Sequence, residues 1–295
     1  MQYICNTCPH KCNIVRNDIV GNGFCAMPAL PIVARAAKHY WEEPCISGTN
    51  GSGTIFFSGC TLKCCFCQNY SISSENFGKQ ISIENLAKIF EKLQNDGAHN
   101  INLVSATQFV PAIIDAFKIF RPSIPVVYNC GGYESVETIK ALSEYVDIWL
   151  PDLKYSSNEL GKKYSKVSNY FDIASKAIKT MSQITPENII DDKGIMKKGL
   201  IIRHLILPGN TKNSIDVLKW IKSEMPQGIM VSLMSQYTPC GNIAEFNELQ
   251  RRITRREYDK VLNTLFELGL ETGFVQDLSS AKEEYIPPFD LTGII

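Results

Sequence analysis

The sequence of 295 residues lacks an excess of charge of either sign, because thirty basic side chains balance thirty acidic ones. A neutral chain has no overall field that attracts nucleic acid or an anionic membrane, and no basic stripe interleaved with aromatic residues indicates an RNA-binding face. No apolar run approaches the ~18 residues of a membrane span, and no apolar segment follows a basic N-terminus as in a secretory signal. We therefore expect a cytoplasmic protein without nucleic-acid or membrane partners.

Hydrophobic residues make up 44% of the chain and charged residues 20%, which is typical of a soluble globular protein with ample core. Eight of the eleven cysteines lie in two tight groups, between Cys5 and Cys25 and between Cys60 and Cys67. Such groups favour metal binding in a reducing compartment over disulfides. For the isolated Cys45, Cys130 and Cys240, a buried and inert thiol is the expectation.

The second group has the spacing C-x3-C-x2-C and directly follows an apolar run at residues 54–58. Thiolates of Cys60, Cys64 and Cys67 on so short a loop can all bind one iron–sulfur cluster, whose fourth iron then stays open to a substrate or cofactor. A structural zinc site and simple packing as small hydrophobes are the alternatives. A zinc site normally shows two C-x2-C pairs or nearby histidines, which this loop lacks, so the spacing favours a cluster. We interpret Cys65 as a filler residue and not as a ligand.

The first group has the spacing C-x2-C-x3-C-x12-C and comprises Cys5, Cys8, Cys12 and Cys25. Four thiolates can close a tetrahedral metal site completely. A bound metal would stabilise this short segment, which has little core of its own. Zinc and a second iron–sulfur cluster both fit. His10 is expected to be a solvated loop residue, although it could replace one thiolate.

From residue 54 onward, short apolar strands alternate with amphipathic helices. Strands are expected at 54–58, 101–105, 125–129, 146–150, 200–207 and 229–234, and helices at 82–95, 110–120, 135–143, 213–222 and 254–268, with one or two more within 159–181. This alternation predicts an α/β fold whose parallel sheet is covered by helices, a partial and open (β/α)6 barrel. The expected organisation is a cysteine-rich extension and linker at 1–53, the barrel at 54–273 with an insertion at 185–198, and a tail at 274–295.

Polar residues at the helix starts predict specific caps. Ser82 is expected to cap the helix at 82–95, and Asn213 with Asp216 to form a capping pair at 213–222. Thr254 and Glu257 have the spacing of a capping box for the helix at 254–268.

In parallel strand–helix architectures, functional sites are built at the carboxyl ends of the strands. The polar residues that lie at these ends in the present sequence are Ser105, Thr107, Asn129, Asp152, Lys154, Arg203, His204 and Gln236. Adjacent residues of a strand point to opposite faces, so only one of Arg203 and His204 can face the barrel interior. A buried arginine needs an anionic partner, which Asp152 would provide. We expect His204 to be a packing residue.

The segments Ser58-Gly59-Cys60 and Cys64-Cys65-Phe66-Cys67 resemble the signature loop of the radical S-adenosylmethionine (SAM) superfamily. More narrowly, Glu42-Glu43-Pro44 and Cys67-Gln68-Asn69-Tyr70 resemble proteins related to pyruvate formate-lyase activating enzyme. The similarity runs from about Cys5 to about Gly273, which is nearly the whole chain.

This resemblance implies a partial barrel and a [4Fe-4S] cluster on Cys60, Cys64 and Cys67. The reduced cluster would cleave SAM to methionine and a 5′-deoxyadenosyl radical, which abstracts a hydrogen atom from a substrate. A low-potential donor such as flavodoxin or ferredoxin would be required. The implied substrate is a glycine in a partner glycyl-radical enzyme, with a small molecule or another peptide as the alternatives. A non-catalytic electron carrier with two clusters and a zinc-stabilised binding module are the rival classes.

The resemblance also implies roles for the residues at the strand ends. Phe66 would form an apolar wall for the adenine, Asn129 would suit the ribose hydroxyls, and Asp152 with Lys154 would border SAM. Arg203 would pair with the SAM carboxylate or with Asp152. In place of the Gly-Gly-Glu turn common in activating enzymes, this chain has Ser105-Ala106-Thr107-Gln108. The two hydroxyls and the backbone carbonyls of that turn would then hold the SAM amino group.

Overall fold

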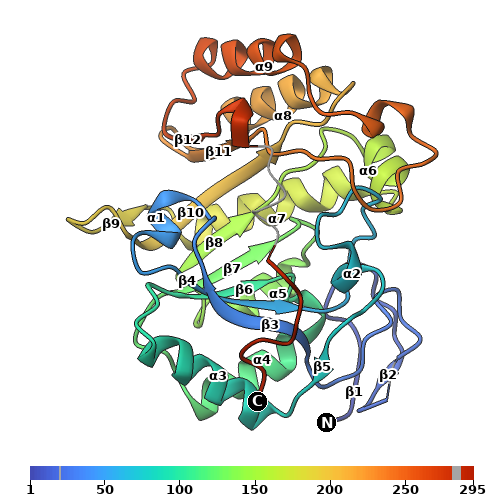
Figure 1. Ribbon diagram of the computed structural model, residues 1–295, viewed down its shortest axis with the longest axis vertical. Coiled ribbons are helices and arrows are strands. Elements are labelled where there is room, and N and C mark those ends of the chain that lie inside the picture. Colours follow the sequence, from blue (N-terminus) through green and yellow to red (C-terminus); the bar gives the residue numbers. More distant parts are fainter. Residues whose placement is uncertain (20, 281–286) are drawn as a thin grey trace.

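The computed structural model describes residues 1–19, 21–280 and 287–295, and a ten-stranded sheet forms the centre of this part of the chain (Figure 1). The strand order is β12-β11-β10-β8-β7-β6-β4-β3-β5, with β9 paired to β10 outside this path. The strands of this sheet are β3 (Ile32–His39), β4 (Ser52–Phe57), β5 (Lys79–Gln80), β6 (Ile101–Val104), β7 (Val126–Cys130), β8 (Ile148–Pro151), β9 (Ile189–Ile190), β10 (Met196–Leu205), β11 (Met230–Met234) and β12 (Gly273–Val275).

Neighbouring strands from β4 to β12 are parallel, and each connection carries helices that cover the sheet (Figure 1). Every residue of β4, β6, β7 and β8 is buried, as expected of strands with both faces covered. The helices of the barrel are α2 (Tyr70–Ser73), α3 (Ile83–Asn95), α4 (Val110–Ile119), α5 (Val136–Leu142), α6 (Asn158–Ser165), α7 (Tyr170–Ile184), α8 (Thr211–Glu224) and α9 (Arg255–Glu267). The predicted α/β partial barrel is confirmed.

Two of the three predicted caps agree with the structure. Ser82 accepts a hydrogen bond from the backbone N–H of Asn85 at the start of α3, and Thr254 with Glu257 forms the capping box of α9. The prediction for α8 is wrong, because this helix already begins at Thr211 after the N-cap Asn210. Asn213 lies inside the first turn of α8, and its side chain accepts from the backbone N–H of Ser156 instead, at 2.8 Å.

The segment expected as a linker contributes a strand to the sheet, which corrects the prediction. Between residues 26 and 53, β3 pairs antiparallel with β4, and the short helix α1 (Pro44–Ser47) follows it. The insertion at 185–198 forms a hairpin of β9 with the start of β10. A seventh parallel strand, β12, starts where the barrel was expected to end. Strand pairing depends on partners distant in the sequence, so short strands such as β12 leave little local signal.

The described part of the C-terminal tail lies along β3 (Figure 1). The backbone N–H of Leu291 donates to the carbonyl of Ala34, and that of Ala36 donates to the carbonyl of Thr292. The Arg35–Asp290 ion pair, at 2.8 Å, adds a side-chain contact. Among the described residues, no helix is both long enough and apolar enough to cross a membrane.

His204 on β10 is a satisfied packing residue, as expected. Its side chain is fully buried, with Nδ1 2.7 Å from the carbonyl oxygen of Leu153 and Nε2 2.9 Å from Ser214 Oγ. A neutral imidazole serves both contacts, because one nitrogen donates and the other accepts. Burial lowers the pKa of His204 from 6.5 to about 4.

We expect this histidine to make the protein sensitive to acid. Between pH 6.5 and 4 the unfolded chain binds a proton at His204 that the folded chain does not, so stability falls as the pH falls. The difference between the two pKa values corresponds to a decrease of about 3 kcal/mol in the free energy of unfolding over this interval. We expect the free energy of unfolding of the metal-free protein, measured with urea, to fall more between pH 7 and pH 4 in the wild type than in His204→Gln. An equal loss in both proteins would contradict the assignment.

Candidate functional site

The three-cysteine loop leaves the carboxyl end of β4 through a tight turn at Gly59. Gly59 has a φ of +73°, and a Cβ atom there would lie 2.4 Å from Cγ of Met27, so only glycine fits. Two neighbouring segments hold the middle of the loop: the backbone N–H of Cys65 donates to the Tyr164 carbonyl at 2.8 Å, and that of Asn242 donates to the Cys65 carbonyl at 2.7 Å. The main chain around the cysteines is therefore anchored from both sides.

The thiols of Cys60, Cys64 and Cys67 lie within electrostatic range of one another, with Cys64 buried and the other two partly buried. Burial, followed by the charges of Cys64 and Cys67, raises the pKa of Cys60 to about 12, and burial also raises the pKa of Cys64. A bound cation would therefore favour the thiolate forms of Cys60 and Cys64. The backbone N–H of Leu62 donates to Cys60 Sγ at 3.3 Å, and Ser165 Oγ lies 2.9 Å from Cys64 Sγ. Hydrogen bonds to sulfur are typical of iron–sulfur sites, so this loop fits a cluster.

Across residues 1–19, 21–280 and 287–295, no three His, Cys, Asp or Glu side chains are grouped tightly enough to hold a single metal ion. This holds for the three-cysteine loop and for the four N-terminal cysteines alike. Thiolates that bind separate irons of one cluster do not need to surround a single ion. The fit of Cys60, Cys64 and Cys67 to a cluster therefore rests on their electrostatic proximity and on the hydrogen bonds to their sulfurs.

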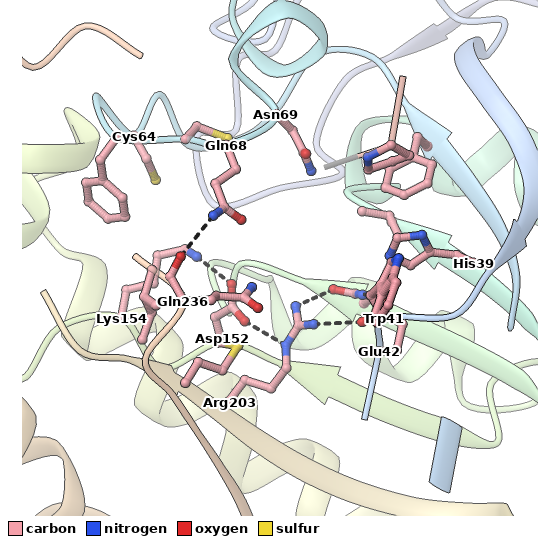
Figure 2. Close-up of a pocket in the computed structure, with 18 residues that line it drawn as sticks. His39, Trp41, Glu42, Cys64, Gln68, Asn69, Asp152, Lys154, Arg203 and Gln236 are labelled. Atoms are coloured by element: carbon pink, nitrogen blue, oxygen red, sulfur yellow. Dashed lines mark hydrogen bonds and ion pairs between the residues drawn. The ribbon is translucent and has the colours of Figure 1, made fainter. Parts of the chain in front are cut away.

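A cavity of about 200 Å³ lies beside Cys64 and Cys67, inside the barrel (Figure 2). Its walls come from the carboxyl halves of the parallel strands and from the loops that follow them, which is the expected location. The polar and aromatic residues that line it are His39, Trp41, Glu42, Phe56, Phe66, Gln68, Asn69, Asn129, Asp152, Lys154, Arg203 and Gln236. Gln68 and Gln236 join two walls through a hydrogen bond of 3.3 Å from Gln68 Nε2 to the Gln236 carbonyl.

A buried network of four charged side chains forms the floor of this cavity (Figure 2). Arg203 lies between two carboxylates, with Nε 2.9 Å from Asp152 Oδ1 and Nη1 3.2 Å from Glu42 Oε2. Lys154 pairs with the other oxygen of Asp152. Asn129 Nδ2 donates to Glu42 Oε1 at 3.1 Å. The formal charges of the four groups cancel, so the network stays neutral while it presents both signs of charge to a ligand.

Within this network, each charged group favours the ionised form of its oppositely charged partners. Burial acts to raise the pKa of Asp152, but Arg203 and Lys154 hold it below its usual value. Burial would likewise lower the pKa of Lys154, yet Asp152 and then Cys64 raise it above the ordinary value. Burial raises the pKa of Glu42, and Arg203 opposes this change. His39 is half-buried, and this burial, followed by the charge of Arg35, lowers its pKa to about 4, so the imidazole is neutral near pH 7.

Most of the residues predicted for this site lie together in the structure. Cys64, Phe66, Cys67, Asn129, Asp152, Lys154 and Arg203 all line the cavity. The structure does not bring Ser105 and Thr107 to it, contrary to the prediction. Thr107 is buried and its Oγ1 donates to Glu134 Oε1 at 2.8 Å, because the turn after β6 directs this hydroxyl inward. The carbonyl of Ser105 accepts from Gln108 Nε2 at 2.7 Å.

Several lining residues were not predicted, and Glu42 is the most important of them. Its carboxylate reaches into the barrel interior from the chain that follows β3, where Asn102 Nδ2 also donates to it at 3.0 Å. In the sequence, the acidic pair Glu42-Glu43 was recognised only as part of a motif shared with a known family and was not predicted as a site residue. A correct assignment of β3 as a strand of the sheet would have pointed to this pair. His39 and Trp41 belong to the same segment and were missed for the same reason.

Comparison with known proteins identifies a family and a related sequence. The model of the radical SAM superfamily matches residues 54–221. The uncharacterized protein MJ0674 of Methanocaldococcus jannaschii is 31% identical over 276 residues, which cover 90% of this chain and 75% of that protein.

Two solved structures share the fold. SuiB of Streptococcus suis bound to S-adenosylmethionine aligns with a TM-score of 0.51 and 13% identity, over 77% of this chain and 50% of SuiB. HydG, a maturase of the FeFe-hydrogenase, aligns with a TM-score of 0.51 and 12% identity, over 79% of this chain and 54% of HydG. The chain spans about half the length of these structures. At these identities the likeness concerns the fold alone.

Proposed function

The chain belongs to the radical SAM superfamily, and on this premise we propose that it is an enzyme that binds a [4Fe-4S] cluster through Cys60, Cys64 and Cys67 and abstracts hydrogen from a substrate. One observation carries the proposal: three neighbouring cysteines adjoin a buried cavity whose floor is the neutral network of Glu42, Asp152, Lys154 and Arg203. When bound, the cluster supplies the electron that cleaves SAM to methionine and a 5′-deoxyadenosyl radical.

The residues around the cavity have properties that suit SAM. Lys154 lies within electrostatic range of Cys64 and Cys67, where it can hold the carboxylate of the methionine moiety close to the open iron. Asp152 and Asn129 offer acceptors for amino and hydroxyl groups. Phe66 packs edge-on against Tyr164 and Tyr237, so its ring is fixed as an apolar wall for the adenine. Binding through fixed groups orients SAM and excludes water.

For the substrate we propose a peptide or protein segment. A second hollow of about 460 Å³ adjoins the cavity and shares Trp41, Glu42 and Gln236 with it. The side chains of Tyr40 and Trp41 line this hollow and are about half exposed, at 51% and 54%. Exposed aromatic residues at a rim are typical of protein-recognition surfaces. Activation of a glycyl-radical enzyme is the member of this class that the sequence resemblance indicates.

The proposed reaction needs a reductant of low potential, so we include flavodoxin or ferredoxin as the electron donor and the cytoplasm as the location. Modification of a small molecule is the alternative within the same superfamily, and it is favoured by the limited volume of the inner cavity. The two alternatives differ in the molecule that loses hydrogen, so an isotope experiment separates them.

The reaction class is tested by release of 5′-deoxyadenosine from SAM by the anaerobically reconstituted, dithionite-reduced protein. We expect release that requires both the reductant and the cluster. A protein with a full cluster that releases none, with and without candidate substrates, would favour the electron-carrier class. The substrate class is tested with peptides that contain deuterated glycine. Deuterium in the released 5′-deoxyadenosine would support a peptide substrate, and deuterium only from labelled small molecules would overturn that part of the proposal.

A further inference from the structure

The tail segment, residues 287–295, lies along β3 beside the cavity (Figure 1). In addition to its two backbone hydrogen bonds with β3, the guanidinium of Arg35 donates to the carbonyl of Pro288 at 3.1 Å. Gly293 has a φ of +75°, and a Cβ atom there would lie 1.9 Å from the carbonyl oxygen of Ala36, so the segment packs directly against the strand. The segment is therefore held in a fixed place.

Alternate residues of this segment face the molecule. Pro287, Phe289 and Leu291 are half-buried, whereas Pro288 and Asp290 are exposed. This is the period of two that is typical of an extended chain with one covered face. Pro287 is one of the residues that line the cavity, so the covered face of the segment reaches the cavity at this residue.

The ring of Phe56 on β4 joins the tail segment to the cavity wall. Phe56 is buried and lines the cavity. Two other rings contact it edge-on, that of Phe289 at a centroid distance of 5.5 Å and that of His39 at 5.8 Å. Edge-to-face contacts of this kind add to the burial of the rings and fix their orientation. Phe289 therefore holds Phe56 in its place in the wall.

This wall lies on the side of the cavity away from the cysteines. Figure 2 shows His39 across the cavity from Cys64 and Lys154, which we assign to the cluster and to the methionine moiety of SAM. The family model matches residues 54–221, so His39 and Pro287 come from parts of the chain on either side of the matched residues. A wall that includes such parts is suited to the substrate, because members of one fold differ in the sites that they add to it.

We propose that Pro287 and Phe289 form the substrate wall of the cavity, in which Pro287 contacts the substrate and Phe289 is a positioning residue that acts through Phe56. The inference rests on the proposed function and names the part of the peptide that enters the cavity. The wall consists of a proline ring, a phenylalanine ring and the imidazole of His39. In a cavity of about 200 Å³, such a wall admits a small, uncharged residue and rejects a bulky or charged one.

The test compares deuterium transfer to 5′-deoxyadenosine from two peptides that carry the same deuterated glycine beside either alanine or phenylalanine. We expect the wild type to favour the alanine peptide. Pro287→Ala and Phe289→Ala should each lower the ratio of the two rates by at least about tenfold, because a methylene group more or less in an apolar pocket already changes discrimination by this factor. A loss of folded protein lowers both rates equally and leaves their ratio unchanged. Phe289→Leu keeps an apolar side chain and should retain most of the discrimination.

Pro288→Ala is the matched control for these variants. Pro288 stands between the two wall residues in the sequence, but its side chain is exposed, and the substitution keeps the carbonyl that accepts from Arg35. The ratio of rates in this control should equal that of the wild type. An unchanged ratio in both Pro287→Ala and Phe289→Ala would overturn the proposal.

A second measurement separates the wall from the proposed function. In the metal-free full chain, mass spectrometry follows the alkylation of Cys67, which lines the cavity, by iodoacetamide and by the bulkier N-(1-pyrenyl)maleimide. We expect the rate with the maleimide relative to iodoacetamide to rise severalfold at Cys67 in Pro287→Ala and Phe289→Ala, because each truncation leaves space in the wall. The partly buried Cys12, which does not line the cavity, should show no change. Where no peptide is a substrate, an unchanged ratio at Cys67 would overturn the wall, and a raised ratio would keep the wall while the peptide class fails.

Discussion

Replacement of Cys60, Cys64 or Cys67 by alanine is expected to reduce 5′-deoxyadenosine release to background. Each thiol holds a fixed place in the loop, because the main chain is fixed by the turn at Gly59 and by the backbone hydrogen bonds of Cys65 with Tyr164 and Asn242. A cluster with two protein ligands would be lost or would bind SAM without the required geometry. Iron and sulfide content, measured on the same samples, should fall together with the activity.

Cys65 offers a matched control within the same loop. It is buried, like Cys64, and its hydrogen bonds to Tyr164 and Asn242 are made by its backbone, which the substitution retains. Cys65→Ala should therefore keep the cluster and most of the activity. Full activity in one of the three ligand variants would remove that residue from the ligand set. Loss of the cluster in Cys65→Ala with retention in Cys64→Ala would exchange the roles of these two residues.

Replacement of Arg203 by methionine is expected to cost both stability and SAM binding. The substitution leaves Glu42 and Asp152 buried beside each other with Lys154 as the remaining cation of the network. Removing one partner of a buried ion pair typically costs about 3–5 kcal/mol, because the other charge is left without compensation. Urea unfolding measures the loss of stability, and equilibrium binding of SAM to the reconstituted protein measures the loss of affinity for SAM.

A second substitution distinguishes the charge of Arg203 from its bulk. Glu42→Gln in the Arg203→Met background removes one of the unpaired carboxylates, so the double variant should lose less stability than the two single effects added together. Arg35→Met is the control, because its ion pair with Asp290 is partly exposed and is expected to contribute at most about 1 kcal/mol. Simple additivity at Arg203 and Glu42 would show that the two residues do not act as a network.

The order of strands and helices was readable from the sequence because it depends on short-range signals. Buried parallel strands are short apolar runs, and helix starts such as Ser82 and Thr254 carry polar caps that bond to residues three positions away. The same local signal failed at α8, where Asn213 resembles a cap but is turned toward Ser156. The strand ends then supplied Asn129, Asp152, Lys154 and Arg203 as candidates, and the cavity contains all four.

The sequence by itself determined the class of fold, the cysteine spacing and the strand ends that carry polar residues, since each of these depends on residues a few positions apart. Only the tertiary structure decided which of these residues meet. It placed Glu42 from the supposed linker against Arg203, turned Thr107 toward Glu134 and away from the cavity, and brought Arg16 to Cys25. These contacts are made by buried polar groups that must find partners wherever packing places them, and no local pattern in a sequence records that choice.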